Sequence, residues 1–101
     1  MAVEQVGEVA LGGQVRPIQL NLEANRFEIR VDEHLALLQF RLRGTNLALI
    51  HTEVPPALQH QGLADALARA ALEYARAHSL RVKVICPFVA KFLTRHPEFQ
   101  P

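Results

Sequence analysis

The sequence predicts an α+β domain with a three-layer-like arrangement, and three observations predict it. Apolar and polar residues alternate through most of residues 26–54, a pattern typical of half-buried antiparallel strands. A loop with one glycine then leads into an alanine-rich segment of helical spacing at residues 62–78. A further strand-like run, residues 81–85, follows this helix. A strand, helix, strand passage makes its two strands parallel if they lie in one sheet.

The composition fits one small domain. The chain has 101 residues, half of them hydrophobic, and a formal net charge of +1. This charge does not indicate a nucleic-acid partner, and no apolar run approaches the ~20 residues of a membrane span. A single cysteine forms no internal disulfide, and the first residues lack a secretory signal pattern. We therefore expect a cytoplasmic protein, and we predict no metal site.

The first part of the chain has the weakest pattern. Residues 1–14 contain three glycines and few bulky groups, so we expect a flexible lead followed by a single domain over residues 15–101. Residues 15–22 predict a short edge strand with Pro17 at its start.

Three strands of an antiparallel meander follow. They are predicted at residues 26–31, 35–43 and 47–54, with turns at residues 32–34 and 44–46. Apolar side chains of the first two strands fall at alternate positions, which predicts one face covered by a helix. These positions are Phe27, Ile29, Val31, Leu38, Phe40 and Leu42.

The helices are predicted from spacing and from their ends. A long helix begins near Gly62 and ends at about His78, and its apolar positions form one face. The fourth strand follows at residues 81–85. Pro87 suits the first position of a short C-terminal helix, and His96 precedes the proline that ends it.

The loop before the long helix, residues 57–62, is the first candidate site. The first N–H groups of a helix have no intrahelical partner and attract phosphate. Gly62 allows a tight turn with no side chain over these donors. A single glycine before a helix is more often only a turn or cap, so the loop alone leaves both interpretations open.

Cys86 is the second candidate. It lies where a strand ends and just before a helix that starts with proline, a position that favours a reactive thiolate. The alternative is a small buried apolar group, and the residues alone favour this alternative.

His51 and Glu53 are the third candidate, because alternate residues of a strand share a face. Either side chain can take a proton from an amine or a thiol, and Thr52 points to the opposite face. An ordinary polar strand surface is the alternative. Lys91 and Arg95 stand one turn apart and either pair with a nucleotide phosphate or form a solvated surface.

Four segments together resemble a known family. They are residues 51–54 (His-Thr-Glu-Val), 59–64 (Gln-His-Gln-Gly-Leu-Ala), 85–89 (Ile-Cys-Pro-Phe-Val) and 96–98 (His-Pro-Glu). In this order and spacing they are similar to the small GNAT-type N-acetyltransferase domain family, a short branch with a Cys-Pro-aromatic-Val motif. The resemblance covers residues 26–99.

The resemblance implies a minimal GNAT fold that binds acetyl-CoA between splayed strands. The pyrophosphate would lie on residues 59–64, the pantetheine arm beside the strand that ends at Val54, and the thioester near Cys86. Ala64 replaces the second glycine of the commonest loop, which is an accepted variant. The coenzyme-binding residues that we predict on this basis are Val54, Gln59, His60, Gln61, Gly62, Leu63, Ala64, Phe88, Lys91 and His96.

The resemblance also implies acetyl transfer to an unidentified amine, by one of two routes. Cys86 is acetylated first, or Cys86 only lines the site while Glu53, His51 or water deprotonates the amine. No helical pattern precedes Gly62 to wall an acceptor groove. The acceptor side is therefore open, completed by a second copy in a homodimer, or absent. In the last case the chain is a non-catalytic coenzyme A-binding module that acts as a sensor or as a subunit of a complex.

Overall fold

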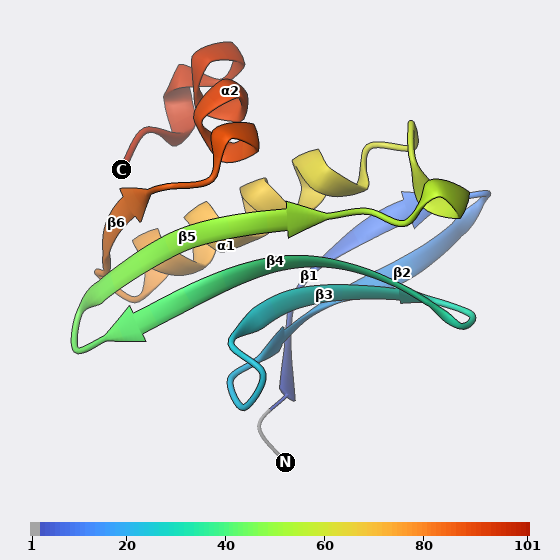
Figure 1. The fold of residues 1–101 in the computed structure, drawn as a ribbon, viewed down its shortest axis with the longest axis horizontal. Helices are drawn as coiled ribbons and strands as arrows, with labels where there is room; N and C mark the ends of the chain where they lie inside the picture. Colours follow the sequence, from blue (N-terminus) through green and yellow to red (C-terminus); the bar gives the residue numbers. More distant parts are fainter. Residues whose placement is uncertain (1–2) are drawn as a thin grey trace.

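A computed structural model describes residues 3–101 and confirms the predicted α+β class. Six strands form one curled sheet in the order β1-β2-β3-β4-β5-β6 (Figure 1). The strands are β1 (Val3–Leu11), β2 (Gln14–Asn21), β3 (Arg26–Val31), β4 (His34–Arg43), β5 (Asn46–Glu53) and β6 (Arg81–Val84). The helices are α1 (Leu63–Ala77) and α2 (Pro87–Arg95), with the short 3-10 helices η1 (Pro56–Leu58) and η2 (Pro97–Phe99).

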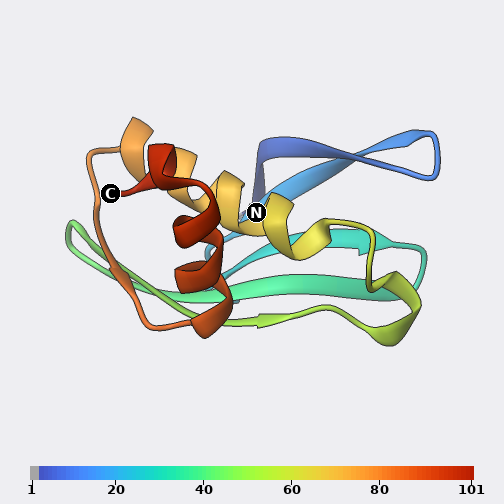
Figure 2. The same ribbon diagram turned by 90° about the horizontal axis from the view of Figure 1, so that it is seen from above.

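Both α-helices lie on the same side of the sheet (Figure 2). We call this side the covered face and the other side the open face, over which no described element packs. The core lies between the helices and the covered face, where Phe27, Ile29, Leu38 and Leu49 are fully buried. The alternation of β3 and β4 produces this arrangement, since Phe27 and Leu38 are register partners on adjacent strands.

The helices match their predicted positions to within a residue at each end. α1 buries one face that includes Leu63, Leu67 and Ala71 against the sheet, and α2 buries Val89 and Phe92. α2 packs on α1 and on β5, so the end of β5 and the starts of both helices come together. No helix within residues 3–101 is long and apolar enough to cross a membrane.

The N-terminal region differs from the prediction. The expected flexible lead instead contains β1, and Met1 and Ala2 of that lead lie outside the described residues. Gly12 and Gly13 both have positive φ, 57° and 79°, which is the backbone of a tight hairpin turn. β1 lies close to α1 at Gly7, because a Cβ there would be in ordinary van der Waals contact with the Ala70 Cβ, at 3.8 Å. Gly12 and Gly13, which had suggested a flexible lead, therefore form a hairpin turn, and the sheet has more strands than predicted.

The predicted edge strand exists as β2, but β1 is the edge. Pro17 lies within β2, opposite Glu8 of β1. β2 pairs with β3 only over Gln19–Asn21, so the other side of Pro17 needs no ladder hydrogen bond. This one-sided pairing is the condition under which a strand tolerates proline.

Candidate functional site

β5 and β6 run parallel, as predicted, and then separate. They pair only from Asn46 with Arg81 to Leu49 with Val84. The Leu49 carbonyl then accepts hydrogen bonds from the N–H groups of both Ile85 and Cys86, each at 2.9 Å. Beyond this point β5 pairs with β4 alone among the described residues. One backbone edge of residues 50–53 is therefore open to a ligand.

A β-bulge at Ile50 marks the same place. Gln39 of β4 pairs with His51, but the next residue, Phe40, pairs with Leu49. The extra residue reverses the alternation, since a shift of one residue exchanges the two faces of a strand. Leu49 points to the covered face, but His51 does not. The bulge thus sends His51 and Glu53 to the open face.

A groove of about 380 Å³ opens beside this divergence. The end of β5, the loop after η1 and the first turn of α1 form one side, and α2 forms the other. Seven of the ten predicted coenzyme-binding residues line it. Its lining residues are Val54, Leu58, Gln59, His60, Gly62, Leu63, Ala64, Asp65, Phe88 and Arg95.

The start of α1 presents unused backbone donors to this groove. The first helical hydrogen bond runs from the Ala66 N–H to the Gly62 carbonyl, and no side chain caps the helix. The N–H groups of the first turn before Ala66 therefore have no intrahelical acceptor. Gly62 has φ 81°, and nothing lies within 4 Å of the position a Cβ would take. This turn is an uncovered site for an anion.

Two glutamines hold the loop in shape. The Gln59 side-chain amide donates to the Val54 carbonyl at 3.1 Å, and that of Gln61 donates to the Ala57 carbonyl at 3.4 Å. Both side chains are thus engaged by the loop itself, and Gln61 does not line the groove. His60 lies between them with φ 66°, a left-handed conformation that helps to turn successive N–H groups toward one side.

Arg95 lines the groove together with Asp65. Its guanidinium donates to both carboxylate oxygens of Asp65, at 3.0 and 3.4 Å, and this pair joins the two helices. Lys91 and His96 do not line the groove. The His96 ring packs on Phe92 with 4.6 Å between centroids.

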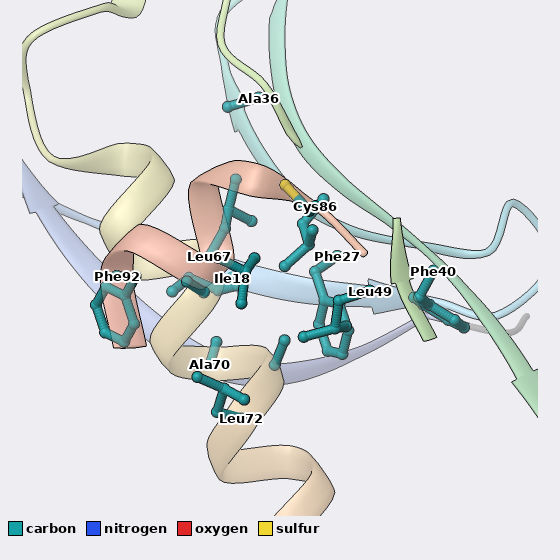
Figure 3. Close-up of a cluster of buried hydrophobic side chains, with 14 of the residues drawn as sticks. Ile18, Phe27, Ala36, Phe40, Leu49, Leu67, Ala70, Leu72, Cys86 and Phe92 are labelled. Carbon is teal, nitrogen blue, oxygen red and sulfur yellow. The ribbon is translucent and has the colours of Figure 1, made fainter. Parts of the chain in front are cut away.

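Cys86 lies at the divergence of the strands. It is 2% exposed and belongs to the buried cluster on the covered face (Figure 3). Its Sγ is 3.3 Å from the Thr52 Oγ1, so the sulfur and the hydroxyl share a hydrogen bond. Sequence reasoning gave Thr52 no role. The signal was available, because a residue between His51 and Glu53 must point toward the opposite face.

His51 and Glu53 meet on the open face. The His51 Nε2 lies 3.0 Å from the Glu53 Oε2, and the side chains are 54% and 63% exposed. The structure therefore places the three predicted catalytic residues in two separate groups, one on each face of the sheet. Cys86 joins Thr52 on the covered face, and His51 joins Glu53 on the open face.

A second groove, of about 340 Å³, lies between α1 and β1. Its charged lining residues are Glu8, Asp65, Glu73 and Arg69, so carboxylates outnumber cations. Such a surface repels phosphate. The groove beside Val54 is therefore the better site for an anionic ligand.

A splayed pair of parallel strands, connected through a glycine loop and an uncapped helix, defines the GNAT-type class of fold. The comparison with protein families agrees. The model of the family described as "GCN5-related N-acetyl-transferase" matches residues 26–101, and the chain belongs to this family. The GNAT-type family recognised from the four sequence segments is thus confirmed.

Vertebrate relatives support this membership. The chain is 34% identical over 86 residues to Protein NATD1 of Bos taurus, covering 80% of this chain and 76% of the relative. It is 31% identical over 86 residues to Protein NATD1 of Gallus gallus, covering 80% and 78%. The protein of that name from Mus musculus is 29% identical over 89 residues, covering 85% and 80%.

Proposed function

We propose that this protein binds acetyl-CoA and transfers the acetyl group to an amine. The observation that carries the proposal is the uncapped start of α1, which opens into the 380 Å³ groove beside the divergence of β5 and β6. Family membership supports the same activity.

The residues present suit the parts of the coenzyme. The N–H groups of the first turn of α1 would bind the pyrophosphate, and Arg95 adds a cation at the same groove. The open edge of residues 50–53 offers backbone groups to the amides of the pantetheine arm. Phe88 and Val54 supply apolar contact along the way. Acetyl-CoA supplies an activated acetyl group as a thioester.

His51 and Glu53 are our proposed proton acceptors. When the neutral imidazole donates its Nε2 hydrogen to Glu53, Nδ1 is left to accept a proton. Removal of a proton from a protonated amine would free its lone pair to attack the thioester carbonyl. The carbon–sulfur bond would then break, and the departing coenzyme thiolate would take the second proton that the nitrogen loses as the amide forms. Because both side chains are exposed on the open face, the acceptor would approach from that side.

We propose that Cys86 lines the site in direct transfer. Its sulfur is buried and hydrogen-bonded to Thr52, which fits a wall better than an acetyl-accepting nucleophile. The two routes differ in one product. Mass spectrometry after incubation with acetyl-CoA would find an acetyl thioester on Cys86 only in the two-step route, and Cys86→Ala would then lose activity.

Release of the coenzyme thiol, measured with a panel of amines, tests the activity. We expect release that depends on the amine and falls in Glu53→Gln. The contrary result is a melting temperature raised by coenzyme A together with no thiol release for any amine. That result would identify a non-catalytic coenzyme A-binding module.

A further inference from the structure

We propose that the open face carries a cationic groove that binds an acidic polypeptide segment, and that this segment bears the acceptor amine. The second part rests on the proposed function, but the first does not. The groove has a volume of about 230 Å³ and is formed by β4, β5 and β6. Its lining residues are Arg41, Arg43, Asn46, Leu47, Ala48, Arg81, Val82 and Lys83.

Strand register builds the groove. Ala48 of β5 pairs with Arg41 on one side and with Lys83 on the other. Asn46 pairs in the same way with Arg43 and with Arg81. Register partners share a face of the sheet, so two cations stand on each side of a floor made by the small Ala48 and Asn46. We call the four side chains Arg41, Arg43, Arg81 and Lys83 the cationic frame.

The cationic frame has no internal compensation. Within residues 3–101 none of its four side chains takes part in a salt bridge. Elsewhere on the open face the pattern is different, because the buried Glu28 pairs with both Arg26 and Arg30. The four charges exceed the formal net charge of +1 of the whole chain. The frame therefore attracts carboxylates from a partner.

The groove lies on the path to the proposed proton acceptors. Ala48 and His51 are three positions apart on β5, which is about 10 Å along a strand. Ile85 is 52% exposed and continues the exposed positions Arg81 and Lys83 of β6 toward the divergence. An extended segment with carboxylates on the frame would pass Ile85 and present an amine near His51.

A peptide fits this surface better than a nucleic acid. A nucleic acid needs a longer basic track and aromatic rings on which bases stack. The aromatic side chains instead lie in the core, in the groove beside Val54 or on the helix layer. Glu53 on the open face would also repel a phosphate chain that continued along β5.

Fluorescence anisotropy with a labelled glutamate-rich peptide containing one lysine tests the groove directly. The matched probe has glutamine in place of each glutamate. We expect the full-length protein to bind the acidic peptide more tightly, and added salt to weaken this binding. Arg41→Gln combined with Lys83→Gln should weaken it about fivefold. Arg69→Gln combined with Arg76→Gln changes the net charge equally on α1 and should leave the affinity unchanged.

Three results would contradict the proposal that this groove binds an acidic peptide. They are equal affinity for the two peptides, equal weakening by the two double variants, and tighter binding of an oligonucleotide of the same charge.

In the transfer assay, the double variant of Arg41 and Lys83 should raise the KM of the acidic peptide about fivefold while kcat stays near its original value. Binding of the acidic peptide without transfer to any amine would refute the proposed acetyl transfer, while the proposed peptide groove would stand. Transfer without preference between the peptides would refute the peptide groove, while the proposed acetyl transfer would stand.

Discussion

The two faces of one sheet differ in what they contribute. On the covered face, Phe27, Leu38 and Leu49 are fully buried beneath the helices. On the open face, His51 and Glu53 are exposed within the same meander. On β5 the β-bulge separates the two groups, because it leaves Leu49 on the covered face and sends His51 and Glu53 to the open face. The covered face therefore serves stability, and we propose that the open face serves the chemistry. Substitutions on the covered face should lower stability, and those on the open face should lower activity while the fold persists.

The largest expected effect is on stability, at Phe27. Phe27→Ala should lower the free energy of unfolding by about 3–5 kcal/mol, because it leaves a cavity in a fully buried site. Arg41→Ala, on the open face of the neighbouring strand β4, should change it by less than about 0.5 kcal/mol, because Arg41 is exposed and belongs to none of the salt bridges within residues 3–101. Denaturant unfolding followed by circular dichroism measures both. Equal losses would mean that the two faces do not differ as described.

The next effect concerns activity alone. Glu53→Gln should lower kcat about a hundredfold, because the His51 imidazole loses its charged partner. The melting temperature and the affinity for coenzyme A should stay unchanged, since Glu53 is exposed and does not line the groove beside Val54 that we propose for the coenzyme. Full activity in this variant would show that the pair of His51 and Glu53 on the open face is not needed for acetyl transfer.

Gly62 separates a ligand effect from backbone strain. Gly62→Val should weaken coenzyme A binding about tenfold in calorimetry, because a β-branched residue at positive φ distorts the turn that we propose binds the pyrophosphate. Gly44→Val is the matched control, since Gly44 also has positive φ and open space around it. Both should lose about 1–2 kcal/mol of stability. Unchanged coenzyme affinity in Gly62→Val alone would contradict the placement of the pyrophosphate.

The smallest expected effect is the dependence of stability on the pKa of Tyr74, a residue of α1. Burial, and secondarily the charge of Glu4, raise the pKa of Tyr74 above 10.0. The folded protein then holds this proton at a pH where the unfolded chain has lost it. The stability linked to this group is therefore full below pH 10.0 and declines as the pH rises through the folded pKa. Tyr74 is the only tyrosine and there is no tryptophan, so its absorbance can be titrated directly, and Glu4→Gln should bring the pKa down.

Strong periodicity explains what the sequence predicted. β3, β4 and the two helices alternate or repeat clearly. The single glycine before α1 left both a turn and a phosphate site open, and the proposed coenzyme role of this loop came from the resemblance of four segments to a family. The bulge at Ile50 was invisible, because it is a property of the pairing between β4 and β5. Arg95 was noticed only as a neighbour of Lys91, since its place in the groove depends on how α2 packs on α1.

The cationic frame was hidden for a related reason. Arg41 and Arg43 are distant in sequence from Arg81 and Lys83, and only the strand order β4-β5-β6 brings them together. Each pair taken alone has the pattern of an ordinary exposed strand face. At β1 the glycines led us to expect a flexible lead, whereas Gly12 and Gly13 form the hairpin turn between β1 and β2.

A crystal of the protein soaked with acetyl-CoA tests the central claim most directly. We expect density for the pyrophosphate on the first-turn N–H groups of α1, beside Arg95, and for the acetyl group at the divergence of β5 and β6 near Thr52 and Cys86. Density for the nucleotide in the groove between α1 and β1, or no bound coenzyme at a saturating concentration, would contradict the account.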